Sequence, residues 1–241
     1  MNNKNVLITG ANKSIGFETA RELGLLGYKV WLGSRDHDRG KSAVDSLTKE
    51  GIDAQLIIID VTSTQSIEEA AQRIQREDGK LDVLINNAGI LGAHDVAPGE
   101  QPVDDIMTVY DTNVFGLIRV TQAFIPVLKC AQQARIIMVS SGLGSLEWVS
   151  DVNHPYSRVQ AMGYTSSKTA VNAITVAFAN ALKAEGISVN AVDPGYTATD
   201  FNGHTGYRTV AEAARGIVWL AEEAKSDMTA GFYFDQNRAP W

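Results

Sequence analysis

Short apolar runs alternate with longer amphipathic segments along the chain. Val6–Ile8 and Leu56–Ile59 are continuously apolar, which is typical of strands that are covered on both faces and belong to parallel sheets. The longer segments between such runs carry apolar residues at helical spacing. Strands are predicted at Asn5–Thr9, Lys29–Gly33, Ala54–Asp60, Leu81–Asn86, Arg135–Ser140, Ser188–Val192 and Phe232–Phe234. Helices are predicted near residues 15–27, 38–50, 64–78, 102–131, 161–185 and 209–224.

This repeated strand–helix alternation predicts an α/β fold with a doubly wound parallel sheet and helices on both faces. Right-handed crossovers in such a sheet bring the carboxyl ends of the strands, and any ligand, to one edge. The pattern contains no repeat, low-complexity tract or linker, so residues 1–241 are expected to form one domain. Residues 142–162 form a long irregular stretch with several large rings, which favours an ordered wall over a disordered loop.

Composition and charge narrow the classes of protein that fit. Hydrophobic residues make up 44% of the 241 positions and charged residues 20%, as in ordinary soluble domains. The net charge of −7 argues against broad binding to nucleic acid or to anionic membranes. A single cysteine, Cys130, excludes an intrachain disulfide and a cysteine-based zinc site, and the scattered histidines suggest no metal site. With no apolar run near the roughly 20 residues of a membrane span, a cytoplasmic protein is expected.

A glycine-rich turn joins the first predicted strand to the first predicted helix. Thr9–Gly16 reads TGANKSIG, in which Gly10 would permit a tight turn and Gly16 a close approach of helix to strand. The free N–H groups at the start of the helix suit a pyrophosphate. Taken alone, the pattern also fits an ordinary strand-to-helix turn. The residues expected to bind a dinucleotide here are Gly10, Asn12, Lys13, Ser14, Ile15 and Gly16.

The end of the second predicted strand bears on the choice between NAD and NADP. Arg35 suits the 2′-phosphate of NADP(H), with Ser34 and Lys13 as further donors. Asp36 is the counter-argument, because an acid at this place binds the ribose hydroxyls of NAD if the strand ends later. A third reading makes Arg35 and Asp36 a solvated surface pair. We favour NADP(H).

Two further strand ends are predicted to lie at the same edge. Asp60 and Val61 follow the third strand, and Asn87, Ala88 and Gly89 follow the fourth. The small residues after the fourth strand would let the backbone approach the cofactor ribose. Asp60 also fits a plain helix cap. The shared location of these residues is the evidence for cofactor binding.

A second group of residues points to proton transfer. Tyr164 and Lys168 lie four positions apart in a predicted helix and so share one face. A lysine ammonium beside the phenol would lower its pKa from about 10 and make it a usable acid and base. Ser141 is placed to hydrogen-bond a substrate carbonyl oxygen. Asn113 stands within a predicted helix, where it is expected to disturb the backbone hydrogen bonds and leave room for a water that connects Lys168 to solvent. Out of context, Tyr164 and Lys168 also fit an amphipathic surface pair.

Together these motifs resemble the short-chain dehydrogenase/reductase family, and the resemblance covers essentially the whole chain. It implies a Rossmann-type seven-stranded sheet in the order 3-2-1-4-5-6-7 and hydride transfer between a nicotinamide and a carbonyl or alcohol carbon. It also implies Tyr164 as acid and base, Ser141 as the residue that orients substrate and Lys168 as the ligand of the nicotinamide ribose. Asn113 would hold the relay water. The segment after the sixth strand would flank the nicotinamide and its phosphates through Pro194, Gly195, Thr197 and Thr199.

The chain departs from the family pattern in two places. Ser14 stands where the family usually has its middle glycine, and the stretch between Ser141 and Tyr164 is longer than usual. With Arg35 and Lys13, the longer stretch resembles the carbonyl-reductase branch. Tyr156 is not a second catalytic candidate, because glutamine and not lysine stands four residues on. The substrate pocket is expected to be walled by Trp148, His154, Tyr156, Tyr196 and Phe201.

The sequence therefore predicts an NADPH-dependent carbonyl reductase or alcohol dehydrogenase that acts on small-molecule ketones or aldehydes. A short loop after the sixth strand predicts an open pocket that admits bulky ketones. The alternative is a non-catalytic NADP(H)-binding sensor, which has no use for Ser141, Tyr164 and Lys168 together. Monomer, homodimer and homotetramer all stay open, because the apolar residues of the helices at 102–131 and 161–185 suit either the core or a subunit interface.

Overall fold

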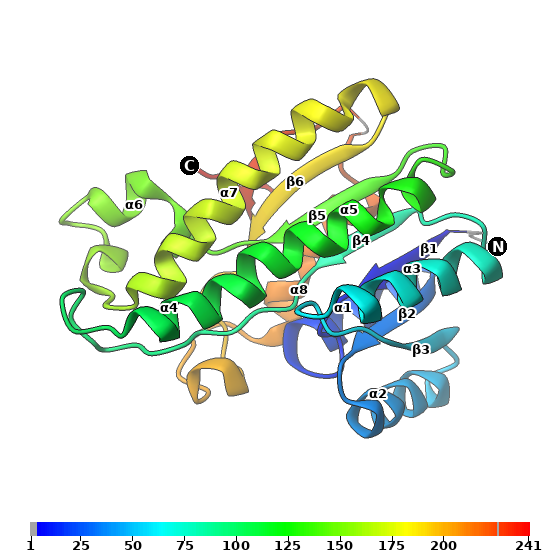
Figure 1. Cartoon of the computed structure of the whole chain (residues 1–241), viewed down its shortest axis with the longest axis horizontal. Coiled ribbons are helices and arrows are strands. Elements are labelled where there is room, and N and C mark those ends of the chain that lie inside the picture. The colour runs from blue at the N-terminus through cyan, green and yellow to red at the C-terminus, as the bar shows by residue number, and fades with distance from the viewer. Residues whose placement is uncertain (1–3, 226) are drawn as a thin grey trace.

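The computed structural model describes residues 4–225 and 227–241 (Figure 1). The strands are β1 (Asn5–Ile8), β2 (Lys29–Ser34), β3 (Ala54–Ile58), β4 (Val83–Asn86), β5 (Arg135–Val139), β6 (Ser188–Asp193), β7 (Phe232–Phe234) and β8 (Asn237–Arg238). The α-helices are α1 (Ser14–Leu25), α2 (His37–Lys49), α3 (Thr64–Glu77), α4 (Val103–Tyr110), α5 (Leu117–Leu128), α6 (Leu146–Ser150), α7 (Met162–Leu182) and α8 (Val210–Glu222).

The described strands form one sheet in the order β3-β2-β1-β4-β5-β6-β7-β8. Neighbouring strands from β3 to β7 pair in parallel, which confirms the predicted α/β class and the strand order. The eighth strand was not predicted. It is only two residues long, pairs antiparallel with β7 through Tyr233 and Arg238, and is exposed, so it carries no apolar pattern.

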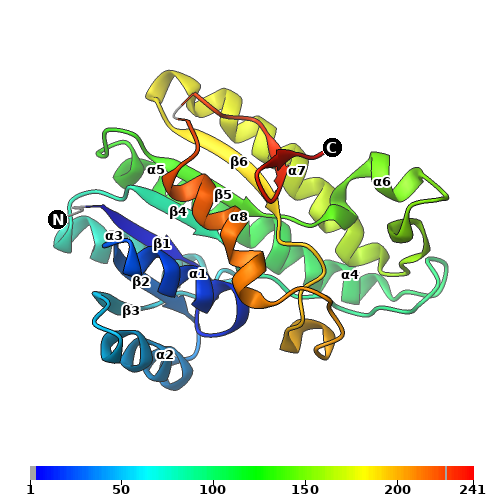
Figure 2. The same ribbon diagram turned by 180° about the vertical axis from the view of Figure 1, so that it is seen from behind.

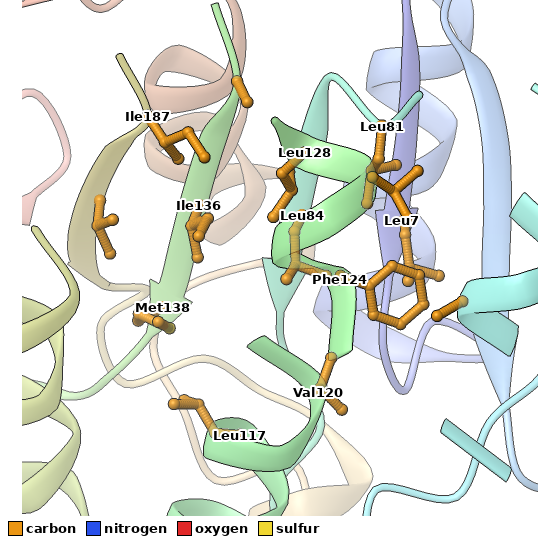
Figure 3. Close-up of a cluster of buried hydrophobic side chains, with 14 of the residues drawn as sticks. Leu7, Leu81, Leu84, Leu117, Val120, Phe124, Leu128, Ile136, Met138 and Ile187 are labelled. Atoms are coloured by element: carbon orange, nitrogen blue, oxygen red, sulfur yellow. The ribbon is translucent and has the colours of Figure 1, made fainter. Parts of the chain in front are cut away.

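Helices cover both faces of the sheet because successive strand residues point to opposite sides. Leu7 and Leu84 belong to the buried cluster beneath α3, α5 and α7, whereas Val6 and Ile8 belong to the cluster beneath α1, α2 and α8. Figure 3 shows Phe124 of α5 against the first of these sheet faces. Phe124 is fully buried, and burying a side chain of this kind contributes roughly 1.5–3 kcal/mol. Figure 2 shows α1 and α8 together on the opposite face.

Polar caps set the starts of several helices. Ser63 accepts a hydrogen bond from the Ser66 N–H at the start of α3. Thr209 and Glu212 form a reciprocal capping box at the start of α8. Each cap satisfies an N–H group that the helix itself leaves without a partner, so these helices begin at defined residues next to the carboxyl ends of the strands.

The predicted helical stretch near 102–131 is confirmed for residues 103–128, where α4, the π-helical segment η1 (Asp111–Gly116) and α5 follow one another without a break. The π-helical segment, which contains Asn113, was not predicted as such. The predicted disturbance of the backbone ladder around Asn113 is confirmed. Gly116 lies so close to Val61 that a Cβ there would be 3.0 Å from the Val61 backbone oxygen. At this spacing, a side chain in place of Gly116 would require a shift of the turn after β3.

Residues 142–162 are ordered as short helices rather than as an irregular loop. After β5 come the 3-10 turn η2 (Gly142–Gly144), helix α6 and the 3-10 turn η3 (Pro155–Arg158). Two further 3-10 turns are η4 (Lys183–Glu185) and η5 (Asp200–Asn202). Within the described residues, no helix is long and apolar enough to cross a membrane.

Candidate active site

A cavity of about 1400 Å³ opens at the carboxyl edge of the sheet. It exceeds the roughly 300–1,000 Å³ of ordinary small-molecule sites, so it has room for a large cofactor and a substrate together. Every residue predicted to bind the cofactor or to wall the substrate pocket lines it, and so do Ser141, Tyr164 and Lys168. The sequence motifs, although spread from residue 10 to residue 201, therefore meet in one place.

The glycine-rich turn is held by the end of β4. The Asn87 amide donates to the carbonyl oxygens of Thr9 at 2.9 Å and Gly10 at 3.1 Å, and the Asn87 N–H donates to the Thr9 hydroxyl at 3.0 Å. Gly10 has φ +63°, and a Cβ on Gly16 would lie 2.5 Å from the Asn87 amide nitrogen and 2.8 Å from the Gly10 oxygen. Only glycine fits such spacing without a shift of the backbone. The turn thus forms a compact cradle of the kind that suits a pyrophosphate.

Ser14 adopts the backbone conformation that favours the glycine usual at this place. Its φ is +53°, which is uncommon for a residue with a Cβ. We expect Ser14→Gly to raise the free energy of unfolding by about 0.5–1 kcal/mol, because relief of the left-handed strain exceeds the added entropy of the unfolded chain. Urea unfolding at equilibrium measures the change.

The matched control for Ser14→Gly is Ser14→Ala, which removes the hydroxyl but keeps the Cβ and its strain. Ser14→Ala is expected to bring no gain in stability. A glycine variant less stable than the wild type would show instead that the hydroxyl stabilises the turn.

At the end of β2, Asp36 is committed to the next helix. Its carboxylate caps α2 by accepting from the Arg39 N–H at 2.9 Å, and it pairs with the Arg39 Nε at 3.1 Å. The hydrogen bond from the Arg39 backbone holds the pKa of Asp36 below its ordinary value, although burial acts in the opposite direction. The Ser34 hydroxyl turns back to the Asp36 carbonyl at 2.8 Å. Arg35, in contrast, is exposed and lines the cavity.

Arg39 is a cavity residue that the sequence analysis missed. Arg35 precedes α2 and Arg39 lies in its first turn, where the Asp36 carboxylate pairs with it, and both residues line the cavity. The sequence shows only that Arg39 is close to Arg35 along the chain.

Asp60 and Val61 organise the turn after β3. The Asp60 carboxylate accepts from the Thr62 N–H at 2.9 Å and from the Thr62 hydroxyl at 2.8 Å. The cap of α3 is Ser63, so the reading of Asp60 as the helix cap is wrong, although its carboxylate does bond within the turn. Ala88 and Gly89 border the cavity beside Asn87.

Tyr164, Lys168 and Ser141 stand together on the opposite wall. The Lys168 Nζ lies 5.6 Å from the centre of the Tyr164 ring and donates to the Val139 carbonyl at 2.8 Å. Tyr164 is half-buried against Phe201, with ring centres 5.5 Å apart. The Ser141 hydroxyl accepts from the Leu143 N–H at 3.2 Å and hydrogen-bonds Tyr164.

Lys168 was predicted to lower the pKa of the Tyr164 phenol, and this prediction is wrong. Burial raises the pKa of Tyr164 above its ordinary value, and the hydrogen bond with Ser141 is what lowers it in part. The Lys168 ammonium is turned toward the Val139 carbonyl, which explains the difference. Burial also lowers the pKa of Lys168, to about 8. Tyr164 therefore carries its proton at neutral pH, and Lys168 is close to its own titration.

Asn113 lies behind the cavity wall rather than on it. Its side chain is 1% exposed, accepts from the Ile90 N–H at 2.8 Å, and donates to the Ile90 carbonyl at 2.9 Å and to the Ser167 hydroxyl at 3.1 Å. Asn113 thus ties the loop after β4 to α7 next to Lys168. The water that it was predicted to hold stays a prediction.

An aromatic wall closes the substrate side of the cavity. Trp148 and His154 stack at 5.4 Å with a 3° interplanar angle, and Tyr156 meets both rings edge-on. Trp148 also packs on Phe232, which itself stacks on Trp241. The C-terminal segment thus supports residues 142–162, as Figure 2 shows for the neighbouring ribbons.

The facing side of the pocket is more open. Tyr196 is 43% exposed and Phe201 40% exposed. Between them, Asp200 pairs with Lys13 of the glycine turn at 2.9 Å and with His204 at 2.9 Å. This bridge across the cavity was not predicted, since its partners lie 187 positions apart.

Residues 4–208 match the family described as short chain dehydrogenase. The chain belongs to this family. It is 33% identical to a (+)-neomenthol dehydrogenase of Arabidopsis thaliana, with 96% of each chain covered. Among solved structures it is similar to an NADPH-bound carbonyl reductase from chicken fatty liver, with a TM-score of 0.88 and 27% identity over 99% of each chain. It is also similar to an NAD⁺-bound xylitol dehydrogenase, with a TM-score of 0.85 and 26% identity over 97% of each chain.

Family membership makes the chain an oxidoreductase. The two solved neighbours bind different nicotinamide cofactors, so the fold does not decide between NAD and NADP. That choice depends on the residues at the end of β2.

Proposed function

We propose that the protein is an NADPH-dependent carbonyl reductase that converts ketones or aldehydes to alcohols. The observation that carries the proposal is the convergence of Tyr164, Ser141 and Lys168 on the wall of the cavity that the glycine turn and Arg35 border. A proton donor, an oxyanion donor and a cation beside a dinucleotide-sized cleft are the parts that carbonyl reduction needs.

The residues of the cavity fit the cofactor. The close-packed glycine turn leaves backbone next to the cleft where a pyrophosphate would lie, and Gly89 does the same beside Asn113. Bound there, NADPH supplies the hydride that reduces the carbonyl carbon. Lys168 would hold the nicotinamide ribose, while Pro194, Gly195, Thr197 and Thr199 would flank the nicotinamide and phosphates.

The proton comes from the Tyr164 hydroxyl. Because burial keeps that phenol protonated, it can donate to the carbonyl oxygen as negative charge develops there. The Ser141 hydroxyl lies beside it and orients the same oxygen. Lys168 Nζ lies 5.6 Å from the centre of the Tyr164 ring, and because burial lowers its pKa to about 8, it can take part in returning the proton to Tyr164.

The end of β2 supports NADPH rather than NADH. Arg35 and Arg39 border the cavity at the place where the adenosine ribose would lie, and Asp36 is occupied as a cap and ion-pair partner. A ribose hydroxyl of NADH would have to compete for that carboxylate, whereas a 2′-phosphate would meet guanidinium groups that suit it.

The pocket supports bulky ketones as the substrate class. Its walls are mainly aromatic, and its Tyr196–Phe201 side is exposed, so a flat or ringed substrate can enter and stack. The neomenthol dehydrogenase and the carbonyl reductase named above are relatives whose names fit this class.

The test is oxidation of NADPH and of NADH with a panel of aryl ketones, cyclic ketones, diketones and small aldehydes. We expect NADPH oxidation with aryl or cyclic ketones, at a lower rate or not at all with NADH. Rapid reaction of small aldehydes with no aryl ketone reduced would contradict the open pocket. Tight NADPH binding with no carbonyl reduced would favour the alternative, a non-catalytic NADP(H) sensor.

A further inference from the structure

A buried carboxylate at the end of β6 takes no part in the mechanism above. Asp193 is 4% exposed and borders the cavity. Its Oδ1 accepts from the Gly195 N–H at 2.8 Å, and the carboxylate also accepts from the Gly142 N–H. Gly142 directly follows Ser141, and Gly195 directly follows Pro194. One side chain therefore ties the turn that carries Ser141 to the turn expected to flank the nicotinamide.

Close packing keeps water away from this carboxylate. A Cβ on Gly142 would lie 2.7 Å from the Asp193 Oδ2 and would also collide with the Tyr156 ring. The Tyr156 ring and the Asp193 carboxylate thus lie against the same side of Gly142. A charge on Asp193 consequently interacts strongly with neighbouring groups, because little water is present to screen it.

The charged and titratable groups that face Asp193 come from several elements. Arg208 is committed to Asp235 at 2.6 Å, so its guanidinium charge acts on Asp193 only over a longer distance. Tyr156 and Tyr164 face it from η3 and α7, and its negative charge raises the pKa of both. Lys168 faces it from α7, and here the negative charge opposes the effect of burial on the lysine pKa.

Two opposing effects act on the ionisation of Asp193. Burial raises its pKa above the ordinary value, and the N–H groups of Gly195 and Gly142 offset only part of that rise, so the charge that we assign to Asp193 depends on these two hydrogen bonds. A carboxylate that accepts backbone N–H bonds favours ionisation.

We propose that Asp193 is a positioning residue for the carbonyl reduction: it locks the Ser141–Gly142 turn against Gly195 and, as a buried anion, keeps the Lys168 ammonium charged. The inference rests on the proposed function. If Asp193 loses its charge, Lys168 gives up its proton at a lower pH, and so does the Tyr164 phenol. Reduction needs protonated Tyr164, so kcat falls at high pH. In the pH profile of kcat, this alkaline limb must then move to lower pH.

The central variant is Asp193→Asn, which keeps the shape of the side chain and removes its charge. We expect the alkaline limb of kcat to move down by about one pH unit at saturating substrate. Asp193→Glu keeps the charge and is expected to restore the wild-type limb. Asp45→Asn, an exposed carboxylate paired with Lys41 on α2, is the control for a change of net charge and should leave the limb in place.

A second measurement needs no turnover. Competitive acylation of the Lys168 amine by a small reagent, read by peptide mass spectrometry, reports its deprotonated fraction. Lys168 of Asp193→Asn is expected to react about three- to tenfold faster than that of the wild type at neutral pH. An equal loss of kcat at every pH with unchanged Lys168 reactivity would show a purely structural role and overturn the inference.

The two readouts separate this inference from the proposed function. A wild type that reduces no carbonyl, with Lys168 reactivity still dependent on Asp193, would refute the reductase but not the coupling. A wild type that turns over, with the same limb and Lys168 reactivity in Asp193→Asn, would refute the coupling alone. Asp193→Ser is the substitute if the asparagine variant does not fold. If neither neutral variant folds while Asp193→Glu does, the carboxylate is needed for folding and the inference is overturned.

Discussion

Replacing Tyr164 by phenylalanine is expected to lower kcat for NADPH-dependent carbonyl reduction by about 10²–10⁴-fold. The substitution removes the proton donor and the hydrogen-bond partner of Ser141, but it keeps the ring that packs against Phe201. NADPH affinity should change little, because Lys168 and the glycine turn stay in place. Initial rates at saturating substrate, together with NADPH fluorescence titrations, measure the two quantities separately.

Tyr110→Phe is the matched control for that experiment. Tyr110 ends α4, pairs with Phe115 and lies outside the residues that line the cavity, so the same chemical change there should leave kcat nearly unaltered. Turnover near the wild-type value in Tyr164→Phe would remove the phenol from the mechanism. Loss of NADPH binding in parallel with kcat would indicate a structural defect in place of a missing proton donor.

The strands of the sheet could be predicted from the sequence because a buried strand consists mainly of apolar residues. A strand covered on both faces, such as the one containing Val6–Ile8, must be apolar at every position, and that pattern is visible without any partner. Apolar periodicity predicted the helical stretch near 102–131 but not the π-helical segment within it. Asn113 was the one sequence sign of an irregularity in this helical stretch. Its amide donates to the Ile90 carbonyl and the Ser167 hydroxyl, which are distant in sequence.

Much of the candidate site was also predictable, because each motif follows a parallel strand and such strand ends meet at one edge. What the motifs could not convey is side-chain direction. The spacing of Tyr164 and Lys168 shows that they share a helix face, but the ammonium reaches the Val139 carbonyl instead of the phenol. The Lys13–Asp200 bridge depends on how two loops approach each other, and neither loop carries a local sign of it.

Asp36 shows how a small geometric fact decides between two readings. An acid near the end of β2 fits NAD binding or a helix cap, and the sequence does not separate these uses. The strand ends at Ser34, and the carboxylate accepts from the Arg39 N–H three residues on. That arrangement turns an argument for NADH into one for NADPH, because the acid now holds Arg39 at the border of the cavity.

Exchanging both Arg35 and Arg39 for alanine is therefore expected to weaken NADPH binding by about 10–100-fold and to leave NADH binding nearly unchanged. Charge-assisted hydrogen bonds to a phosphate are each worth on the order of tenfold in affinity, and only NADPH carries the 2′-phosphate that would accept them. Dissociation constants for both cofactors, measured by fluorescence at two salt concentrations, give the preference and its ionic part. The NADPH preference of the wild type should fall with added salt, because both arginines are exposed.

The single variants divide the effect between the two residues. Arg35→Ala should cost more than Arg39→Ala, because Asp36 already engages part of the charge of Arg39. Arg215→Ala, on the exposed face of α8, is the control for loss of one positive charge and should leave both affinities as they are. If the wild type binds NADH as tightly as NADPH, or if Arg35→Ala weakens both alike, then Asp36 contacts the ribose and must leave its cap to do so. Asp36→Ala would then lower NADH affinity, whereas in the arrangement described here it loosens the start of α2 and leaves NADPH bound.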